Sequence, residues 1–303
     1  MKMNEESELP VWRSLLFVPA NVPRFVEKAA SCGADAIIVD LEDSVPLDAK
    51  DVARGGVAGT VRAVGAGGAD VLVRVNQPLE LCVRDFEAAI APEVRALVLP
   101  KTESAGHVQL LAELADRIER KKGMRVGHTR FVVAVESPGA LEQICAIAAA
   151  HSRNVAIIAG GEDFALATGS IPTPETMLYP RQRSVIAASC AGLLPLGLIS
   201  SVADFNDADA YRAAIARSRS FGLRGSTCIH PKVVPLLNAG FRPGDDELAA
   251  ARRVVDAFVQ ATEAGRASLQ VDGKMVDYPI YERALRLIEV DARIRARESR
   301  GAH

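Results

Sequence analysis

Two carboxylates in this chain stand where they could hold a metal ion. Glu136 comes at the end of the apolar run FVVAVES, and Asp163 ends the next such run, VAIIAGGED. A buried β-strand that stops at a carboxylate sets a negative charge at the rim of a parallel sheet, where ligands bind. Arg74, near the end of the run VLVRVN, adds a cation that suits an anionic substrate. The pattern therefore predicts a metal site that faces an anion.

Other polar side chains follow similar runs. Because the carboxyl ends of barrel strands share one face, we expect all of them in one ring around one opening. The ring would consist of Asp40, Glu42, Asp43, Arg74, Asn76, Lys101, Glu136, Asp163, Asp204 and His230.

Oxygen ligands decide which metal this ring suits. Mg²⁺ keeps several waters and takes one or two carboxylates, here Glu136 and Asp163, and Mn²⁺ accepts similar ligands. Glu42 and Asp43 are placed to hold the waters of such an ion through hydrogen bonds. The five cysteines are scattered and the five histidines lack H-x-H or H-x-x-x-H spacing, which argues against zinc.

The elements that position these residues alternate between two types. Continuous apolar runs are typical of parallel strands covered on both faces, and helical patterns lie between them. Eight such units predict an α/β fold of the (β/α)8 TIM barrel type, with a doubly wound sheet as the alternative. The expected strands are 13–19, 35–43, 71–76, 96–101, 131–137, 155–163, 197–204 and 226–231, and the expected helices are 24–33, 104–122, 137–152 and 208–222.

A barrel of this kind would end near residue 240. We therefore expect a catalytic barrel over 1–240 and a C-terminal helical extension over 241–303, acting as a lid or an oligomerisation arm. Within the extension, the segment 268–279 contains Asp272-Gly273, which is a hairpin signal between two amphipathic helices.

Bulk composition excludes several classes of protein. The chain has 303 residues and a net charge of −2, which gives no reason to expect nucleic acid or an anionic membrane as a partner. No apolar run approaches the ~20 residues that span a bilayer. The N-terminal segment MKMNEESELP is acidic and lacks an apolar signal region, so we expect a cytoplasmic location.

Several motifs in this order resemble the citrate lyase β-subunit-like family of the HpcH/HpaI aldolase superfamily. The motifs are RSLLFVPAN, DAIIVDLEDSVPLDAKDVAR, VLVRVN, LVLPK, VAVESPGAL, GGEDFALATG, FGLRGSTCIHP and DGKMVDYP, and they span about residues 11 to 290. The resemblance implies a (β/α)8 barrel with one Mg²⁺ that is ligated by Glu136 and Asp163. It implies that Arg74 contacts the reacting carboxylate or carbonyl and that Asp40, Glu42 and Asp43 line the site.

The resemblance also implies a role for the two ends of the chain. Arg24 and Lys28 would lie where the phosphates of CoA approach. The C-terminal segment would close over a neighbouring subunit of a homotrimer or hexamer and bring Asp277 to the site. One departure is Ala20, where relatives commonly have glycine; alanine resists positive φ, so this loop is expected to differ.

The reaction we expect is reversible carbon–carbon cleavage of a 3-hydroxyacyl thioester, such as citryl-, malyl- or citramalyl-CoA. Arg74, Asp277, Asp40 and Glu42 would be catalytic, while Asn76 and Lys101, with Arg74, would bind substrate. Rival hypotheses are a Schiff-base aldolase that uses Lys101 and a metal-dependent aldolase acting on free 2-oxo-hydroxy acids. A citrate lyase β subunit acting on an acyl-carrier thioester, or a non-catalytic scaffold, also remains open.

Overall fold

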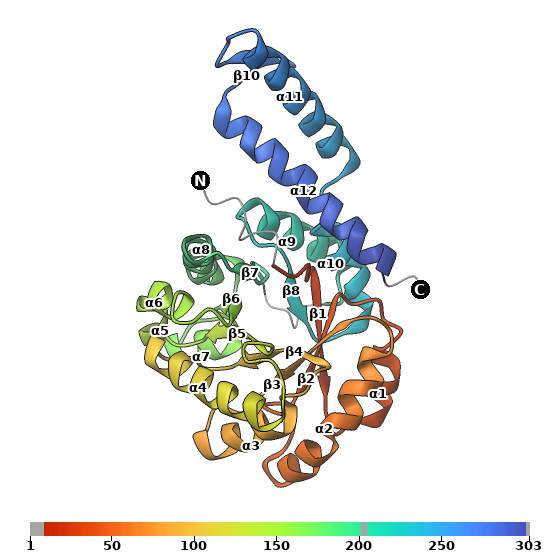
Figure 1. Cartoon of the computed structure of the whole chain (residues 1–303), viewed down its shortest axis with the longest axis vertical. Helices are drawn as coiled ribbons and strands as arrows, with labels where there is room; N and C mark the ends of the chain where they lie inside the picture. The colour runs from red at the N-terminus through yellow and green to blue at the C-terminus, as the bar shows by residue number, and fades with distance from the viewer. Residues whose placement is uncertain (1–8, 201–204, 301–303) are drawn as a thin grey trace. The chain divides into compact units, whose positions relative to one another are not determined.

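Eight parallel strands form the centre of the chain in this computed structural model, which describes residues 9–200 and 205–300 (Figure 1). They pair in the order β7-β6-β5-β4-β3-β2-β1-β8, each parallel to its neighbour. The strands are β1 (Ser14–Pro19), β2 (Ala36–Asp40), β3 (Asp70–Arg74), β4 (Val94–Leu99), β5 (Arg130–Val135), β6 (Asn154–Ala159), β7 (Leu194–Leu196) and β8 (Ser226–Cys228).

Backbone hydrogen bonds between the two end strands of this order close the barrel. The Gly197 amide donates to the Gly225 carbonyl at 2.8 Å, and the Arg224 amide donates to the Pro195 carbonyl at 3.0 Å. A sheet whose first and last strands meet is a barrel rather than an open, doubly wound sheet. The predicted (β/α)8 barrel is thus confirmed.

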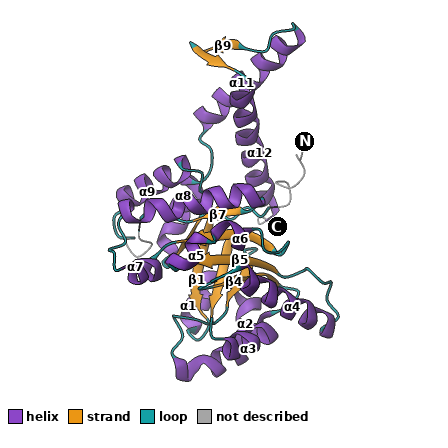
Figure 2. Cartoon of the chain, turned by 90° about the vertical axis from the view of Figure 1, so that its left-hand side faces the viewer, coloured by secondary structure: helices purple, strands orange, loops and turns teal. Residues whose placement is uncertain are grey.

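Helices cover the outside of the strands (Figure 2). Two of them begin at serine N-caps: Ser104 accepts a hydrogen bond from the His107 amide, and Ser137 accepts one from the Ala140 amide. The helices are α1 (Pro23–Ala29), α2 (Lys50–Gly65), α3 (Leu79–Ala89), α4 (Ala105–Lys121), α5 (Pro138–Glu142), α6 (Ile144–Ala148), α7 (Glu162–Thr168), α8 (Pro174–Ala191), α9 (Ala208–Ser220) and α10 (Val234–Gly240), with short 3₁₀ turns η2 (Leu47–Ala49) and η3 (Pro231–Val233).

Strand side chains alternate between two apolar layers, which explains the continuous apolar runs. In β2, Ala36 and Ile38 belong to the inner layer of the barrel. Ile37 and Val39 belong to the outer layer, where they pack under the helices. All four are fully buried, as expected for a strand that is covered on both faces.

Two predicted elements differ from the structure. The strand expected over 197–204 is wrong: β7 lies earlier, and residues 201–204, with Asp204, fall outside the described residues. Pro195 cannot donate a hydrogen bond within a sheet, but β7 has a regular ladder only with β6, so the missing N–H is tolerated. The single helix expected over 137–152 is two helices, because the backbone at Gln143 leaves the helical region.

The C-terminal extension forms a second compact unit. The chain divides into Met1–Phe241 and Arg242–His303, and the second unit contains α11 (Asp245–Glu263), β9 (Leu269–Val271), β10 (Lys274–Val276) and α12 (Tyr278–Arg300). The antiparallel hairpin turns at Asp272 and Gly273, both with positive φ, as the Asp-Gly signal predicted. Over the described residues, no helix combines the length and apolar character needed to cross a bilayer.

A buried ion-pair network ties the N-terminal end of the barrel together. Glu119 on α4 is fully buried and accepts hydrogen bonds from the Thr129 and Gly127 amides at 2.7 and 2.8 Å. The Arg153 guanidinium, which is 2% exposed, donates to the same carboxylate at 3.0 and 2.6 Å. One carboxylate therefore joins α4 to the segments that lead into β5 and β6.

We expect Glu119→Ala to lower the free energy of unfolding by about 3–5 kcal/mol, because it leaves Arg153 buried without its main anion. Chemical denaturation followed by circular dichroism would measure this loss. The exposed Glu113→Ala on the same helix is the control, with an expected change within about 0.5 kcal/mol. A loss below about 1 kcal/mol for Glu119→Ala would show that the network contributes little.

Candidate active site

Arg74 and Asp40 form a bidentate ion pair at the carboxyl end of the barrel. They end the adjacent strands β3 and β2 and are opposite one another in the register of that ladder. The Arg74 Nε and Nη2 atoms donate to the two oxygens of Asp40, both at 2.7 Å. Two parallel bonds of this kind fix the plane of a guanidinium as well as its position.

Asp40 is itself held in place. Its carboxylate is 1% exposed and also accepts hydrogen bonds from the Glu42 amide and from the amide and hydroxyl of Ser44. Burial alone would raise the pKa of Asp40, but the hydrogen bonds and charge of Arg74 outweigh it and leave the pKa below its usual range. Asp40 is thus placed to orient Arg74.

Arg74 rests on an aromatic ring and reaches a second carboxylate. Its guanidinium carbon lies 4.6 Å from the centroid of Phe17, which projects from the middle of β1. Its Nη1 atom lies 2.9 Å from an oxygen of Glu42 and 3.4 Å from one of Asp43. The arginine is therefore fixed on three sides while remaining 15% exposed toward the opening.

Lys101 connects this arginine cluster to the two predicted metal ligands. Its Nζ atom lies 2.7 Å from Glu42, 3.5 Å from Asp43 and 3.8 Å from Asp163. Its backbone amide donates to Glu136 at 2.8 Å. The residue has a φ of 47°, a left-handed conformation that is rare for a side chain other than glycine and that often occurs at functional sites.

Glu136 and Asp163 follow the neighbouring strands β5 and β6, and Lys101 contacts both. Glu136 follows β5 directly, whereas Asp163 lies in the first turn of α7, after Gly160 and Gly161, whose positive φ values of 84° and 115° turn the chain. Burial raises the pKa of Glu136 to about 7, and the nearby charge of Asp163 acts in the same direction. Two carboxylates that repel each other, with the Asp163 side chain 39% exposed, form a suitable donor set for a divalent cation.

This donor set fits Mg²⁺ or Mn²⁺ better than a metal that needs a full protein cage. In the described part of the chain, no three His, Cys, Asp or Glu side chains come together as a metal site. Two carboxylates with open positions are what a hydrated Mg²⁺ ion takes, with substrate oxygens completing the shell.

Other predicted residues lie farther from this cluster. Asn76 is 3% exposed, and its Nδ2 atom donates to the Leu41 carbonyl and to Asp85, so its amide braces the loop behind the cluster. Arg24 and Lys28 are exposed on α1, and no hydrogen bond or ion pair joins them to the cluster in the described residues.

Two further predicted positions have local roles in the structure. The His230 ring caps η3 by accepting a hydrogen bond from the Lys232 amide, and it stacks on Phe205 with the ring centroids 4.9 Å apart. Asp277 lies in the second unit at the start of α12, where its carboxylate accepts a hydrogen bond from the Ile280 amide at 3.3 Å. Ala20 has no positive φ, so the alanine causes no backbone strain.

Three residues that contribute to this site were missed in the sequence analysis. Phe17 was read only as a core strand residue. Lys50 holds the acidic loop by donating to the Leu41 and Glu42 carbonyls at 2.8 and 2.6 Å, and its signal was a lone lysine just after that loop.

The third is Arg181 on α8, which is 4% exposed and donates through Nε to the Leu198 carbonyl at 3.2 Å. Burial lowers its pKa to about 10, and the charge of Glu136 opposes that shift. The sequence gives no signal for Arg181, because it looks like any other polar residue of a helical segment.

The fold and this charged rim define the chain as a (β/α)8-barrel enzyme. The chain belongs to the HpcH/HpaI aldolase/citrate lyase family, whose model matches residues 13–231. It is 34% identical to the citrate lyase subunit beta of Escherichia coli K12 over 275 residues, 90% of each chain. It is 32% identical to an L-malyl-CoA/beta-methylmalyl-CoA lyase of Cereibacter sphaeroides over 288 residues, 88% of this chain and 90% of that one.

A solved structure shares the whole architecture. The protein CitE from Mycobacterium tuberculosis, in complex with magnesium, acetoacetate and coenzyme A, superposes with a TM-score of 0.73. It is 27% identical and covers 94% of this chain, which covers 99% of it. The resemblance drawn from the motifs is thereby confirmed.

The geometry predicts that Glu136 titrates near neutral pH in EDTA-treated protein. Its raised pKa means that the carboxyl is protonated below about pH 7 and ionised above it. The infrared difference between wild type and Glu136→Gln should show a protonated carboxyl band that grows as the pH falls through about 7. Asp163→Asn should move the midpoint to lower pH because it removes a neighbouring negative charge.

Glu113→Gln, exposed on α4, controls for the substitution itself. A Glu136 midpoint at the ordinary glutamate value of about 4.3 would contradict this account of the site.

Proposed function

We propose that this enzyme cleaves or forms the carbon–carbon bond of a 3-hydroxyacyl-CoA thioester, with Mg²⁺ or Mn²⁺ as cofactor. The products of cleavage would be a 2-oxo acid and acetyl-CoA or a homologue. The observation that carries the proposal is one rim that combines an oriented arginine, Arg74, with the carboxylate pair Glu136 and Asp163. Relatives named as citrate lyase β subunits and malyl-CoA lyases support the same class of reaction.

Glu136 and Asp163 would hold the metal. When bound, the ion supplies Lewis-acid polarisation of the substrate oxygen that becomes a carbonyl. The solved CitE structure contains magnesium together with a 3-oxo acid and coenzyme A, which supports this cofactor and substrate class. The remaining steps depend on side chains of this chain.

Arg74 would stabilise the enolate oxygen of the departing acyl group. A guanidinium has five N–H donors; Asp40 takes one from Nε and one from Nη2, and Nη1 faces Glu42 and Asp43, so the second N–H of Nη2 remains for a substrate oxygen. Because Asp40 and Phe17 fix the guanidinium before substrate arrives, little reorganisation is needed when charge develops. Asp40 is therefore a positioning residue for Arg74, and Glu42 would act similarly on Lys101.

Lys101 is better suited to bind an anion than to form a Schiff base. Burial alone would lower its pKa, but the hydrogen bond to Glu42 and the charges of Glu42, Asp43 and Asp163 raise the pKa above its usual range. A Schiff-base lysine needs a lowered pKa so that the neutral amine is present. This argues against the Schiff-base aldolase hypothesis.

The remaining assignments complete the proposal. Asp277 on the second unit would exchange the proton with the enolate carbon, with the extension acting as a lid that excludes water. Arg24 and Lys28 would meet the CoA phosphates, and Asn76 would support the substrate loop. We propose a cytoplasmic homotrimer or hexamer in which Asp277 serves a neighbouring subunit.

Two related functions share this site. A metal-dependent aldolase acting on free 2-oxo-hydroxy acids would not need CoA, so inhibition by free CoA distinguishes it. A citrate lyase β subunit would act on an acyl-carrier thioester and co-purify with partner subunits. Both would keep the roles given to Glu136, Asp163 and Arg74.

Purified enzyme should release a 2-oxo acid from one member of a panel of malyl-, citramalyl- and citryl-CoA, and EDTA should abolish that release. Arg74→Ala should reduce turnover by about 10²–10³-fold, the loss typical of a transition-state charge donor. A coupled dehydrogenase assay measures the 2-oxo acid, and circular dichroism checks that the fold is intact. Near-normal turnover by Arg74→Ala, or activity insensitive to EDTA, would refute the mechanism.

The trans role of Asp277 can be tested by mixing two inactive variants. Asp277→Ala and Asp163→Ala each lack one required group, so each should be inactive alone. If Asp277 serves a neighbouring subunit, oligomers reassembled from both variants contain some complete sites and should regain part of the activity. No recovery in mixed oligomers that mass photometry shows to have formed would place Asp277 in cis or outside catalysis.

A further inference from the structure

A second cavity lies at the end of the barrel opposite to the candidate active site. Its volume is about 960 Å³. Arg95 lines it from the second residue of β4, Arg130 and Asn154 from the first residues of β5 and β6, and Leu193 from just before β7. Because strands of about six residues rise about 20 Å, the cavity is separate from the rim that carries Arg74.

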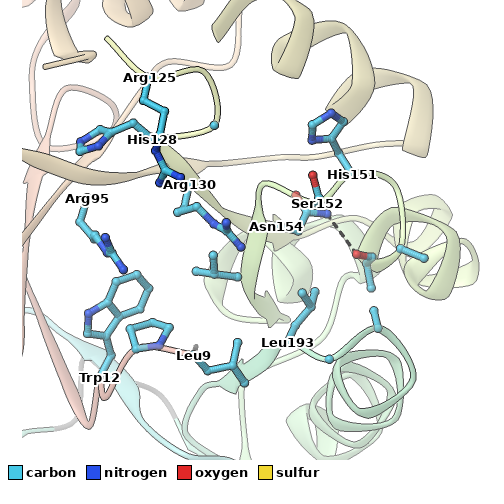
Figure 3. A pocket seen from close by; sticks show the side chains of 17 residues that line it. Leu9, Trp12, Arg95, Arg125, His128, Arg130, His151, Ser152, Asn154 and Leu193 are labelled. Atoms are coloured by element: carbon cyan, nitrogen blue, oxygen red, sulfur yellow. Dashed lines mark hydrogen bonds between the residues drawn. The ribbon is translucent and has the colours of Figure 1, made fainter. Parts of the chain in front are cut away.

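The cavity is lined by cations. Three arginines and two histidines contribute to its wall, and the described lining residues include no aspartate or glutamate. Figure 3 shows the side chains of Arg95, Arg125 and Arg130 on one side of the space and those of His151, Ser152 and Asn154 across from them. The whole chain has a net charge of −2, so this concentration of positive charge is local.

Two of these arginines are not paired with an acidic side chain among the described residues. Arg95 and Arg125 are exposed, and neither side chain has a hydrogen bond or ion pair within the described residues. Across the cavity, the Nδ1 atom of His151 accepts a hydrogen bond from the Arg153 amide at 3.2 Å, which leaves the proton on Nε2. Arginine forks and an imidazole N–H are donors that suit phosphate oxygens.

Asn154 adds a buried acceptor without a donor. The residue is 4% exposed, and its Nδ2 atom donates to the Ile147 and Ala148 carbonyls at 3.0 and 3.1 Å, which fixes the orientation of the amide. Its Oδ1 atom has no hydrogen-bond partner. Because this atom is shielded from solvent, Asn154 shapes the wall of the cavity and is not one of the ligand contacts.

We propose that this cavity binds a phosphorylated nucleotide. The arginines would take the phosphates, and the Nε2–H of His151 would donate to them. The volume lies at the upper end of ordinary ligand pockets, which favours a nucleotide over a small dicarboxylate. The proposal does not depend on the proposed reaction, because none of its residues belongs to the catalytic rim.

Calorimetric titration of full-length, EDTA-treated enzyme with ADP tests this site. Wild type should bind ADP, and the double variant Arg95→Gln/Arg125→Gln should bind at least about tenfold more weakly, since two charge-assisted contacts are lost. Both side chains are exposed, so the fold should be retained. Arg62→Gln, an exposed arginine on α2, is the matched control and should bind like wild type.

A second titration with CoA distinguishes the source of the nucleotide. CoA also carries a phosphorylated adenosine, and the proposed function already places one CoA at the catalytic rim. A second bound CoA per chain that the double variant loses would therefore assign this cavity to CoA rather than to a free nucleotide. Either source supports the proposal. ADP binding that the double variant leaves unchanged would overturn it.

Acidic residues that precede Leu9 in the sequence are tested as competitors of the nucleotide. Glu5, Glu6 and Glu8 precede Leu9, which lines the cavity. The variant Glu5→Gln/Glu6→Gln/Glu8→Gln is therefore titrated in parallel. If neither this variant nor wild type binds ADP at millimolar concentration, the proposal fails.

Discussion

Arg74 and Asp40 end adjacent strands and meet through two parallel hydrogen bonds of 2.7 Å, and the other charged groups of the rim are arranged around that pair. Asp40 is buried and accepts a hydrogen bond from the Glu42 amide in the loop that follows it. Because Asp40 is held in place by the barrel, its ion pair holds the Arg74 guanidinium in place as well. Glu42 then links Arg74 to Lys101, and Lys101 links both to Glu136. The rim is therefore one connected network of charges.

The sequence predicted the parts of this network that strand ends alone determine. In a parallel barrel every strand ends at the same face, so Arg74, Asp40 and Glu136 could be placed together from the apolar runs before them. The contribution of Phe17 and Arg181 could not be predicted, because both act through contacts with residues distant in the chain. β7 was missed because Pro195 contradicts a strand unless one side of it lacks a regular ladder.

The two ends of the barrel differ in the sign of the charge that their exposed side chains carry. At the carboxyl end, five carboxylates surround Arg74 and Lys101, and burial, together with the nearby charges of Asp163 and Glu42, raises the pKa of Glu136. At the opposite end, Glu119 and Arg153 neutralise each other inside the fold, while Arg95 and Arg125 face a cavity. An excess of negative charge favours a divalent cation, and an excess of positive charge favours phosphate.

The most direct test of the catalytic account is whether Glu136 and Asp163 hold the metal. Mn²⁺ binding to the purified enzyme, followed by electron paramagnetic resonance, measures this without relying on turnover. We predict one bound Mn²⁺ per chain in wild type, strong loss of binding in Glu136→Gln and in Asp163→Asn, and wild-type binding in Glu113→Gln. Equal Mn²⁺ binding by all four proteins would contradict the metal site and the mechanism built around it.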